Sequence, residues 1–133
     1  RFARYLGETY NNLGAIHYRR KDHQQALWYL SRAAAKRPSS PRVHYNYGLA
    51  LSLAQKRDRA LEELVLATEL DPTDVEIRFA MGVVLLRLGR VEEAEKAFHE
   101  CVRSDPKHER ALHNLRLIDE LRRRAREGEI QVE

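Results

Sequence analysis

Histidine and cysteine are the residues of this chain whose side chains could bind a metal ion or act as nucleophiles. A metal site needs two or more such ligands at helical spacing, with a third nearby. His108 and His113 are five positions apart, so they do not share a helix face well. His99 and Cys101 are two positions apart and point in different directions on a helix. We therefore expect no metal site and no cofactor, and we interpret six histidines as surface and groove side chains: His17, His23, His44, His99, His108 and His113.

The usual motifs of catalysis are missing from the sequence. There is no phosphate-binding loop, no GxSxG nucleophile turn and no HExxH metal helix. The chain has one cysteine, which cannot form a disulfide within the chain. We therefore predict that the chain is not an enzyme.

A cluster of arginines near the end of the chain could contact nucleic acid or acidic lipid. Acidic residues are interleaved with it, and the pairs Asp119–Arg123 and Glu120–Arg124 have the i,i+4 spacing that pairs charges along a helix. Arginines at a helix C-terminus also complement its dipole. We interpret the cluster as a solvated helix end and expect neither nucleic acid nor a membrane as partner; steep salt dependence of nucleic-acid binding would favour the alternative. The cluster contains Arg122, Arg123, Arg124 and Arg126.

Composition indicates a helical chain with a core. Of 133 residues, 43% are hydrophobic and 33% are charged, and Gly and Pro number only 6 and 4, which disfavours a loop-rich or all-β fold. The longest apolar run, residues 79–86, is too short to cross a membrane. No signal peptide is visible. The sequence does not identify the compartment, although a cytoplasmic location is favoured. Because the chain begins at Arg1, we expect a fragment of a longer protein or the mature part of a processed one.

A period of 34 residues is the strongest pattern in the sequence. It recurs in glycine, alanine and proline, and in positions that are always small or always large and apolar. Six columns without insertion or deletion cannot be chance. The columns are Gly14, Gly48, Gly82; Ala26, Ala60, Ala94; Pro38, Pro72, Pro106; Ala33, Ala67, Cys101; Leu30, Leu64, Phe98; and Leu13, Tyr47, Met81.

Each 34-residue unit contains two stretches of helical periodicity, such as Arg42–Ala54 and Asp58–Leu70, joined by a short break. This pattern predicts a helical hairpin. The glycine and alanine columns let two antiparallel helices approach closely, and we expect the large apolar column to fill the space between one hairpin and the next. The proline column ends the second helix of each hairpin. Cys101 lies in a small-residue column, where we expect a buried, inert thiol.

Helix boundaries follow from capping residues. Asp22 and Asp58 are suited to be N-caps, Ser40 precedes Pro41 at a helix start, and Thr73 with Glu76 has the spacing of a capping box. We expect seven helices in one domain, 1–127, with repeats at about 7–40, 41–74 and 75–108. A capping helix over 109–127 has a polar outer end, as a terminal helix requires, and 128–133 is expected to be a flexible tail.

The chain resembles the tetratricopeptide repeat family from Gly7 to about Asp119. The family pattern is met at Tyr10, Leu13, Gly14, Ala26, Leu30, Ala33 and Pro38; at Gly48, Leu51, Ala60, Leu64, Ala67 and Pro72; and at Gly82, Leu85, Ala94, Phe98 and Pro106. It departs at His44, Arg78 and Cys101. The resemblance implies an all-α, right-handed solenoid of three helix pairs plus a C-terminal capping helix. It also implies a protein-interaction scaffold whose concave face is lined by the first helix of each pair.

Family geometry places twelve residues in this concave groove. Within this set, Tyr45, Leu49, Phe79, Val83 and Leu86 form an apolar patch, which marks an interaction site when polar groups surround it. The alternative is that the patch packs against a missing neighbour. The predicted groove residues are Asn11, Ala15, Tyr18, Arg19, Tyr45, Asn46, Leu49, Phe79, Val83, Leu86, Arg87 and His113.

Some family members grip a C-terminal carboxylate with Lys, Arg and Asn at set groove positions. Here the matching positions are Asn11, Ala15, Asn46, Glu76 and Ala80, of which only Asn46 fits. We therefore predict a protein or peptide partner held in the groove without a carboxylate clamp. The alternatives are a self-assembling structural solenoid, possible as a homo-oligomer, and a regulatory domain of a larger enzyme. The sequence does not name the partner.

Overall fold

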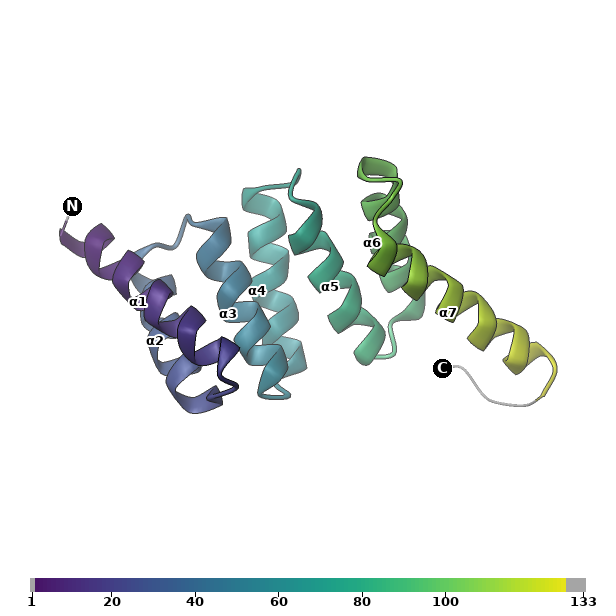
Figure 1. Ribbon diagram of the computed structural model, residues 1–133, viewed down its shortest axis with the longest axis horizontal. Helices are drawn as coiled ribbons and strands as arrows, with labels where there is room; N and C mark the ends of the chain where they lie inside the picture. The colour runs from purple at the N-terminus through teal and green to yellow at the C-terminus, as the bar shows by residue number, and fades with distance from the viewer. Residues whose placement is uncertain (1, 129–133) are drawn as a thin grey trace.

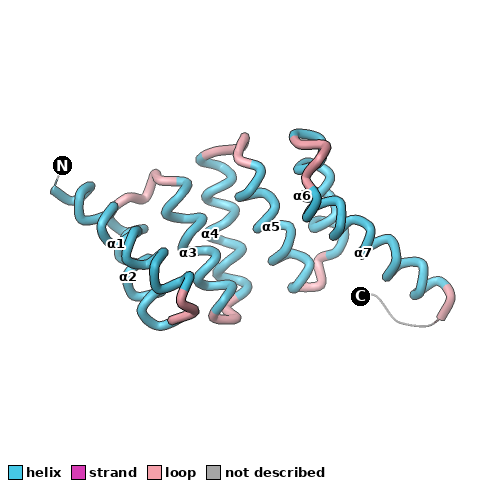
Figure 2. The backbone as a smooth tube through the Cα atoms, viewed as in Figure 1, coloured by secondary structure: helices cyan, strands magenta, loops and turns pink. Residues whose placement is uncertain are grey.

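The computed structural model describes residues 2–128, and this part of the chain contains seven helices and no strand. The seven predicted helices are therefore confirmed. They form an elongated array in which α1, α3, α5 and α7 make a front layer and α2, α4 and α6 lie behind (Figures 1 and 2). The helices are α1 (Phe2–Arg19), α2 (His23–Lys36), α3 (Pro41–Leu53), α4 (Arg57–Leu70), α5 (Val75–Arg87), α6 (Val91–Ser104) and α7 (Glu109–Arg126).

Each hairpin packs within itself and then against the next. Helix α1 contacts α2, α3 contacts α4 and α5 contacts α6, while α2 meets α3, α4 meets α5 and α6 meets α7. The second helix of each hairpin ends two residues before a proline of the repeating column, at Lys36, Leu70 and Ser104. The predicted role of the prolines is confirmed, because a proline cannot continue the helix.

The glycine column sets the distance between the two helices of each hairpin. A Cβ atom on Gly48 would lie 2.8 Å from Cγ of Leu64, and one on Gly82 would lie 2.7 Å from Cε1 of Phe98. Gly14 faces Leu30 in the same way. The large apolar column therefore packs onto the glycine of its own hairpin, a contact that the sequence analysis did not assign to it. Buried leucines and Phe98 then continue the core from one unit into the next.

The turn inside each hairpin has the same backbone conformation. Lys21, Gln55 and Gly89, again 34 residues apart, all have a positive φ, of 60°, 65° and 78°. The following N–H groups reach five residues back: those of Asp22 and Lys56 donate to the carbonyl oxygens of His17 and Leu51 at 2.9 and 2.8 Å. This is a Schellman motif, which favours glycine at the residue with positive φ. Only the third copy has that glycine.

Two predicted caps are correct. The side chain of Asp22 accepts from the N–H of Gln25, and that of Ser40 accepts from the N–H of Val43. Two others are wrong. With Asp58 as the N-cap, α4 would begin at Arg59, but it begins two residues earlier, at Arg57. Asp58 therefore lies in the first turn, and the N-cap is Lys56, which makes no side-chain hydrogen bond to the helix start.

The capping box at Thr73 is also wrong. Asp74 is the N-cap of α5, and its carboxylate accepts from the N–H groups of Glu76 and Ile77 at 2.9 and 3.2 Å. Thr73 instead donates its hydroxyl to Asp71 at 2.8 Å. A carboxylate next to the helix start reaches two N–H groups and also complements the helix dipole, so it displaces the hydroxyl one residue earlier.

Helix α7 ends the array. It continues the first-helix pattern, with Ala111 and Ile118 buried on α6, but Arg116 stands at the position of the glycine column. An arginine there leaves no room for a helix to approach as closely as α6 approaches Gly82. The predicted tail falls largely on residues 129–133, which lie outside the described residues. Within residues 2–128, no helix is long and apolar enough to cross a membrane.

Candidate functional site

The front layer carries a hollow of about 260 Å³ between α1, α3, α5 and the start of α7. The 34-residue period places one side chain of each helix next to its equivalent in the following helix, so that Tyr45 of α3 and Phe79 of α5 face the same space. The lining combines an apolar floor with arginine and glutamate at the rim. We call this hollow the groove; its lining residues are Tyr18, Tyr45, Leu49, Ser52, Leu53, Glu76, Phe79, Ala80, Val83, Val84, Arg87 and Arg110.

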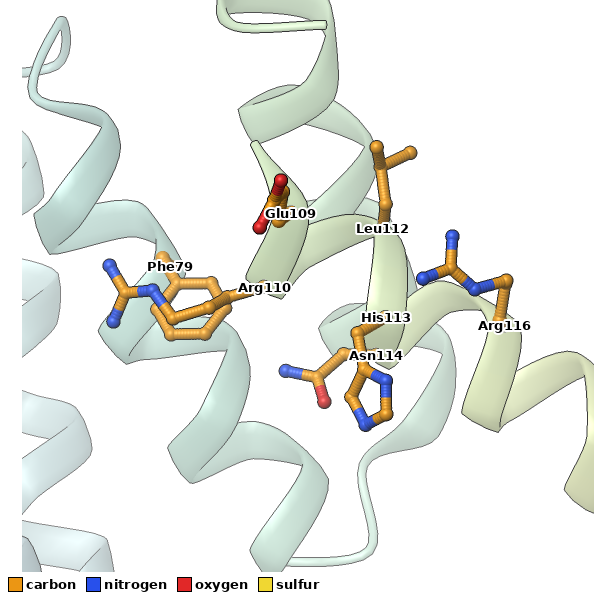
Figure 3. Close-up of a pocket in the computed structure, with 7 residues that line it drawn as sticks. All are labelled: Phe79, Glu109, Arg110, Leu112, His113, Asn114 and Arg116. Atoms are coloured by element: carbon orange, nitrogen blue, oxygen red, sulfur yellow. The ribbon is translucent and has the colours of Figure 1, made fainter. Parts of the chain in front are cut away.

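Phe79 is held in place by contacts on several sides. Its ring centroid lies 5.7 Å from that of Phe98 and 5.1 Å from the stacked imidazole of His108. The guanidinium carbon of Arg110 lies 4.5 Å from the ring centroid (Figure 3). A cation over an aromatic face is attracted by the ring quadrupole. The ring is therefore a fixed surface between the core and the groove.

Glu76 connects α5 to α7 beside this ring. Its carboxylate oxygens lie 2.5 Å from Nη2 of Arg110 and 3.3 Å from Nε2 of His108. The other nitrogen of His108, Nδ1, accepts from the N–H of Ala111, so the imidazole also caps α7. Burial opposes ionisation of Glu76, but the hydrogen bonds and positive charge of Arg110, helped by His108, hold its pKa below the ordinary value. The carboxylate therefore stays charged and keeps Arg110 over Phe79.

Tyr45 is the polar group of the groove floor. Burial raises the pKa of its hydroxyl, and the negative charge of Glu76 adds to this effect. The phenol is therefore neutral across the physiological range and can donate a hydrogen bond to a ligand.

A second hollow, of about 640 Å³, opens between α5 and α7. Phe79 and Arg110 belong to both hollows, so the two form one continuous surface on the front layer. Figure 3 shows Asn114 and His113 of α7 extending toward the space that Phe79 faces. The lining residues are Phe79, Glu109, Arg110, Leu112, His113, Asn114 and Arg116.

Seven of the twelve predicted groove residues line one or other hollow: Tyr18, Tyr45, Leu49, Phe79, Val83, Arg87 and His113. The guanidinium of Arg87 also donates to the hydroxyl of Ser52 at 3.3 Å, which joins α5 to α3.

The other five predicted residues lie elsewhere. Asn11 is buried, and its carbonyl accepts from the amide of Asn46 at 2.9 Å, so these two side chains tie α1 to α3. Arg19 is exposed and Ala15 is half-buried, but neither lines a hollow described above. Leu86 is half-buried against the core cluster around Phe98 and Ile118.

The apolar patch has a packing role that the sequence argument did not assign to it. Tyr45 and Leu49 are half-buried against the first core cluster, and Phe79 and Val83 against the second. Each side chain therefore contributes one face to the core and the other to the groove. This arrangement explains the apolar residues without a missing neighbour, and it leaves a smaller exposed area for a ligand.

Sequence reasoning missed Arg110 as a groove residue, and it placed Glu76 in the groove without pairing it to Arg110. The signal was present in the repeat: Arg42, Glu76 and Arg110 form a further 34-residue column whose charge alternates in sign. Since equivalent first-helix residues of neighbouring units lie side by side, opposite charges in one column predict an ion pair. Glu76 and Arg110 form that pair.

Cys101 has the buried position that was predicted for it. Burial raises the pKa of its thiol to about 11, so the nucleophilic thiolate is scarce at neutral pH. Among residues 2–128, no group of three or more His, Cys, Asp or Glu side chains is arranged to hold a metal ion.

Comparison with known proteins gives consistent matches. Two family models described as Tetratricopeptide repeat match residues 11–75 and 53–117. Tetratricopeptide repeat protein 8 of Caenorhabditis elegans is 28% identical over 137 residues, covering 97% of this chain and 26% of that protein. Protein O-mannosyl-transferase TMTC1 of Mus musculus is 27% identical over 124 residues, covering 90% of this chain and 13% of that protein. The chain thus spans about a quarter or less of the length of these relatives.

Solved structures share the fold. The TPR domain of Arabidopsis OM64 superimposes with a TM-score of 0.85 at 17% identity, covering 89% of this chain and 98% of that one. The first TPR of Spaghetti (RPAP3), bound to the HSP90 peptide SRMEEVD, gives a TM-score of 0.84 at 19% identity, covering 88% of this chain and 93% of that one.

Proposed function

We propose that this chain, which belongs to the tetratricopeptide repeat family, is a scaffold that binds a partner protein or peptide in the groove between α1, α3 and α5. The observation that carries the proposal is the groove floor, where Tyr45 and Phe79 are half-buried yet line an open hollow. An aromatic side chain that is already fixed loses little entropy when a ligand packs on it. Aromatic residues in such positions commonly dominate binding energy.

Polar groups at the rim suit an extended polypeptide. The neutral phenol of Tyr45 and the guanidinium of Arg87 offer donors for the carbonyl groups of a bound main chain. Phe79 and Val83 offer an apolar surface for its side chains. One similar protein, RPAP3, has been solved with an HSP90 peptide, which is consistent with a peptide-binding role for this fold.

The test is an affinity pull-down with mass spectrometry that compares the wild type with the Tyr45→Ala, Phe79→Ala double variant. We expect the partners retained by the wild type to be reduced about tenfold or more, because two anchor side chains are lost. The matched control is Leu66→Ala with Leu70→Ala, which removes two exposed apolar side chains from the back layer. Unchanged partners in the groove variant, with an unchanged circular dichroism spectrum, would contradict the proposal.

Self-assembly is a second candidate, favoured by the outer surface of α1. Ala50 of α3 has 0% exposure and lies in one core cluster with Ala26 and Leu30 of the preceding hairpin, whereas its equivalent in the first unit, Ile16, is 37% exposed. Phe2 and Tyr5 on the same helix are 75% and 68% exposed. A further helical hairpin or a second copy of the chain could cover this surface.

Light scattering separates the two candidates. The groove proposal expects a monomer at micromolar concentration, whereas self-assembly expects a larger particle that Tyr5→Asp with Ile16→Asp converts to a monomer. The third alternative, a regulatory domain of a larger enzyme, is supported by the transferase names of relatives such as Protein O-mannosyl-transferase TMTC1, of which the chain matches 13%.

A further inference from the structure

The back layer carries a hollow of about 440 Å³ that shares no residue with the groove. It lies between α2 and the start of α4, with Tyr47 and Leu51 of α3 as its floor. Trp28, which is 46% exposed, stands at its edge. We call this hollow the furrow; its lining residues are Gln24, Leu27, Trp28, Ser31, Arg32, Tyr47, Leu51, Lys56 and Arg59.

The furrow has three cationic side chains and no acidic one in its lining. Arg32 donates to the carbonyl oxygen of Trp28 at 3.0 Å, and its guanidinium carbon lies 3.5 Å from the centroid of the Trp28 ring. Arg59 donates to the hydroxyl of Tyr47 at 2.8 Å. These partners are neutral, so they orient the guanidinium groups without cancelling their charge.

One acid of α4 is engaged elsewhere: the carboxylate of Glu63, four residues after Arg59, lies 2.6 Å from Nδ1 of the His44 imidazole on α3.

The next hairpin provides an internal comparison. It has an equivalent hollow of about 280 Å³, in which Leu61, Met81 and Leu85 stand 34 residues after Leu27, Tyr47 and Leu51. There the equivalents of Lys56 and Arg59 are Arg90 and Glu93. Arg90 donates to both carboxylate oxygens of Glu93, at 2.8 and 2.7 Å.

The fold therefore produces this hollow in both units, but the charges differ. In the second unit the cation is neutralised by its own neighbour on α6. In the first unit Arg59 replaces the acid, so the lining of the furrow keeps its positive charges without a carboxylate beside them. Trp28 is also specific to the first unit, since Glu62 stands at the equivalent position.

We propose that the furrow binds an oxyanion, the phosphate or carboxylate of an acidic segment in a partner protein. The guanidinium groups of Arg32 and Arg59 and the ammonium group of Lys56 would donate to the anionic oxygens. The exposed part of the Trp28 side chain, on which Arg32 also lies, would pack against the apolar part of the same segment. This site is independent of the groove, so the chain could hold one partner on each layer.

Trp28 is the only tryptophan in the chain, so its fluorescence reports directly on the furrow. The probe is a blocked peptide, Gly-Glu-Leu-Xaa-Leu-Glu-Gly, in which the central residue is phosphoserine, glutamate or serine. We expect a saturable change in Trp28 fluorescence with the phosphoserine peptide, a weaker one with glutamate and the weakest with serine. Affinity should fall as salt rises, because the contacts are between charges.

The decisive variant is Arg59→Glu, which gives the first unit the charge pattern of the second. We expect it to weaken binding of the phosphoserine peptide about tenfold or more, since an oriented cation becomes an anion. The matched control is Arg103→Glu, which makes the same change in net charge at an exposed position of α6. Circular dichroism checks that both variants are folded.

Each outcome decides the proposal. Equal binding of the phosphoserine and glutamate peptides would support it and would assign the ligand as a carboxylate-rich segment. An equal loss of peptide affinity in the Arg59→Glu and Arg103→Glu variants would overturn it. The net positive charge of the chain would then be enough to explain the binding, without a specific site. The same response to inorganic phosphate alone would overturn the need for a protein segment. No response of Trp28 to any of the peptides would overturn the site itself.

Discussion

His44 and Arg78, which lie one repeat apart on α3 and α5, both approach the proline carbonyl that precedes their own helix. Nε2 of His44 lies 2.7 Å from the carbonyl oxygen of Pro38, and Nη2 of Arg78 donates to that of Pro72 at 2.7 Å. Each side chain also contacts an acid on the second helix of its own hairpin. Nδ1 of His44 lies 2.6 Å from Oε1 of Glu63. Nε of Arg78 lies 3.0 Å from Oε2 of Glu100, and these two side chains form an ion pair whose geometry is not that of a hydrogen bond.

These contacts predict a coupled pair at His44 and Glu63. Both side chains are mostly buried, so removing one leaves the other without its partner in a place that water reaches poorly. We expect His44→Ala and Glu63→Ala each to lower the free energy of unfolding by about 2 kcal/mol, and the double variant to lower it by about 1–2 kcal/mol less than the sum. Urea unfolding of the four proteins measures the coupling. Strict additivity would show that the contact contributes nothing of its own.

The backbone conformation of the hairpin turns predicts a substitution that stabilises the folded chain. Gln55 has a φ of 65°, a conformation that costs a residue with a Cβ atom about 1 kcal/mol and costs glycine little. We expect Gln55→Gly to raise the free energy of unfolding by up to about 1 kcal/mol, after the greater entropy of glycine in the unfolded chain is subtracted. Gly89→Ala, at the equivalent position, should lower it by about 1 kcal/mol. Thermal unfolding of both variants measures these two changes in stability. A Gln55→Gly variant that is less stable than the wild type would contradict the prediction.

The 34-residue period was enough to predict the helices, the close approach of the two helices of a hairpin at the glycine column, and the burial of Cys101. These features repeat because the same local contact is made in each unit. Capping at Thr73 was mispredicted because Asp74 lies beside it and reaches the free N–H groups of α5 instead. Capping at Asp58 was mispredicted because α4 begins two residues earlier than that cap requires, and no side chain caps it. Asn11 and Leu86, which the sequence predicts to lie in the groove, line neither hollow for a different reason. Their exposure depends on how one hairpin tilts on the next, which column spacing does not specify.

Cys101 predicts a loss of stability at high pH. Burial raises the pKa of its thiol from 9.0 to about 11 in the folded chain, so the folded state resists ionisation that the unfolded state undergoes earlier. The contribution is fully present below pH 9 and is lost as pH rises toward 11. Cys101→Ala, which matches Ala33 and Ala67 of the same column, should remove this part of the pH dependence.

Urea unfolding of both proteins at pH 7.5, 9 and 10.5 measures the effect. The difference in stability between wild type and Cys101→Ala should shrink or change sign between pH 9 and pH 10.5. Other groups also titrate in this range. Their contributions to stability cancel when the two proteins are compared, because both proteins contain these groups. A difference that stays constant with pH would show that the thiol ionises equally easily in both states.

The groove predicts weak binding of peptides that end in Glu-Glu-Val-Asp. A clamp for a terminal carboxylate needs basic side chains, and the matching positions here carry Ala15, Glu76 and Ala80. Glu76 is ionised and adds repulsion, while Arg110, the nearest cation to it, is already paired with it. We therefore expect the peptide SRMEEVD, which is bound in the RPAP3 structure, to show no micromolar affinity for this chain by calorimetry.

The reciprocal change tests the reason for that weakness. Ala15→Lys with Glu76→Lys places basic side chains at two of the matching positions, and neither change introduces a side chain at the buried position of Ala80. We expect this variant to bind SRMEEVD at least about tenfold more tightly than the wild type, because two charge-assisted contacts become available and one repulsion is lost. The same peptide with an amidated C-terminus is the control, and it should gain less because it lacks the terminal carboxylate. Micromolar binding by the unmodified chain would show that Arg110 releases Glu76 to hold the carboxylate, so that the clamp is formed by a different residue of the same groove.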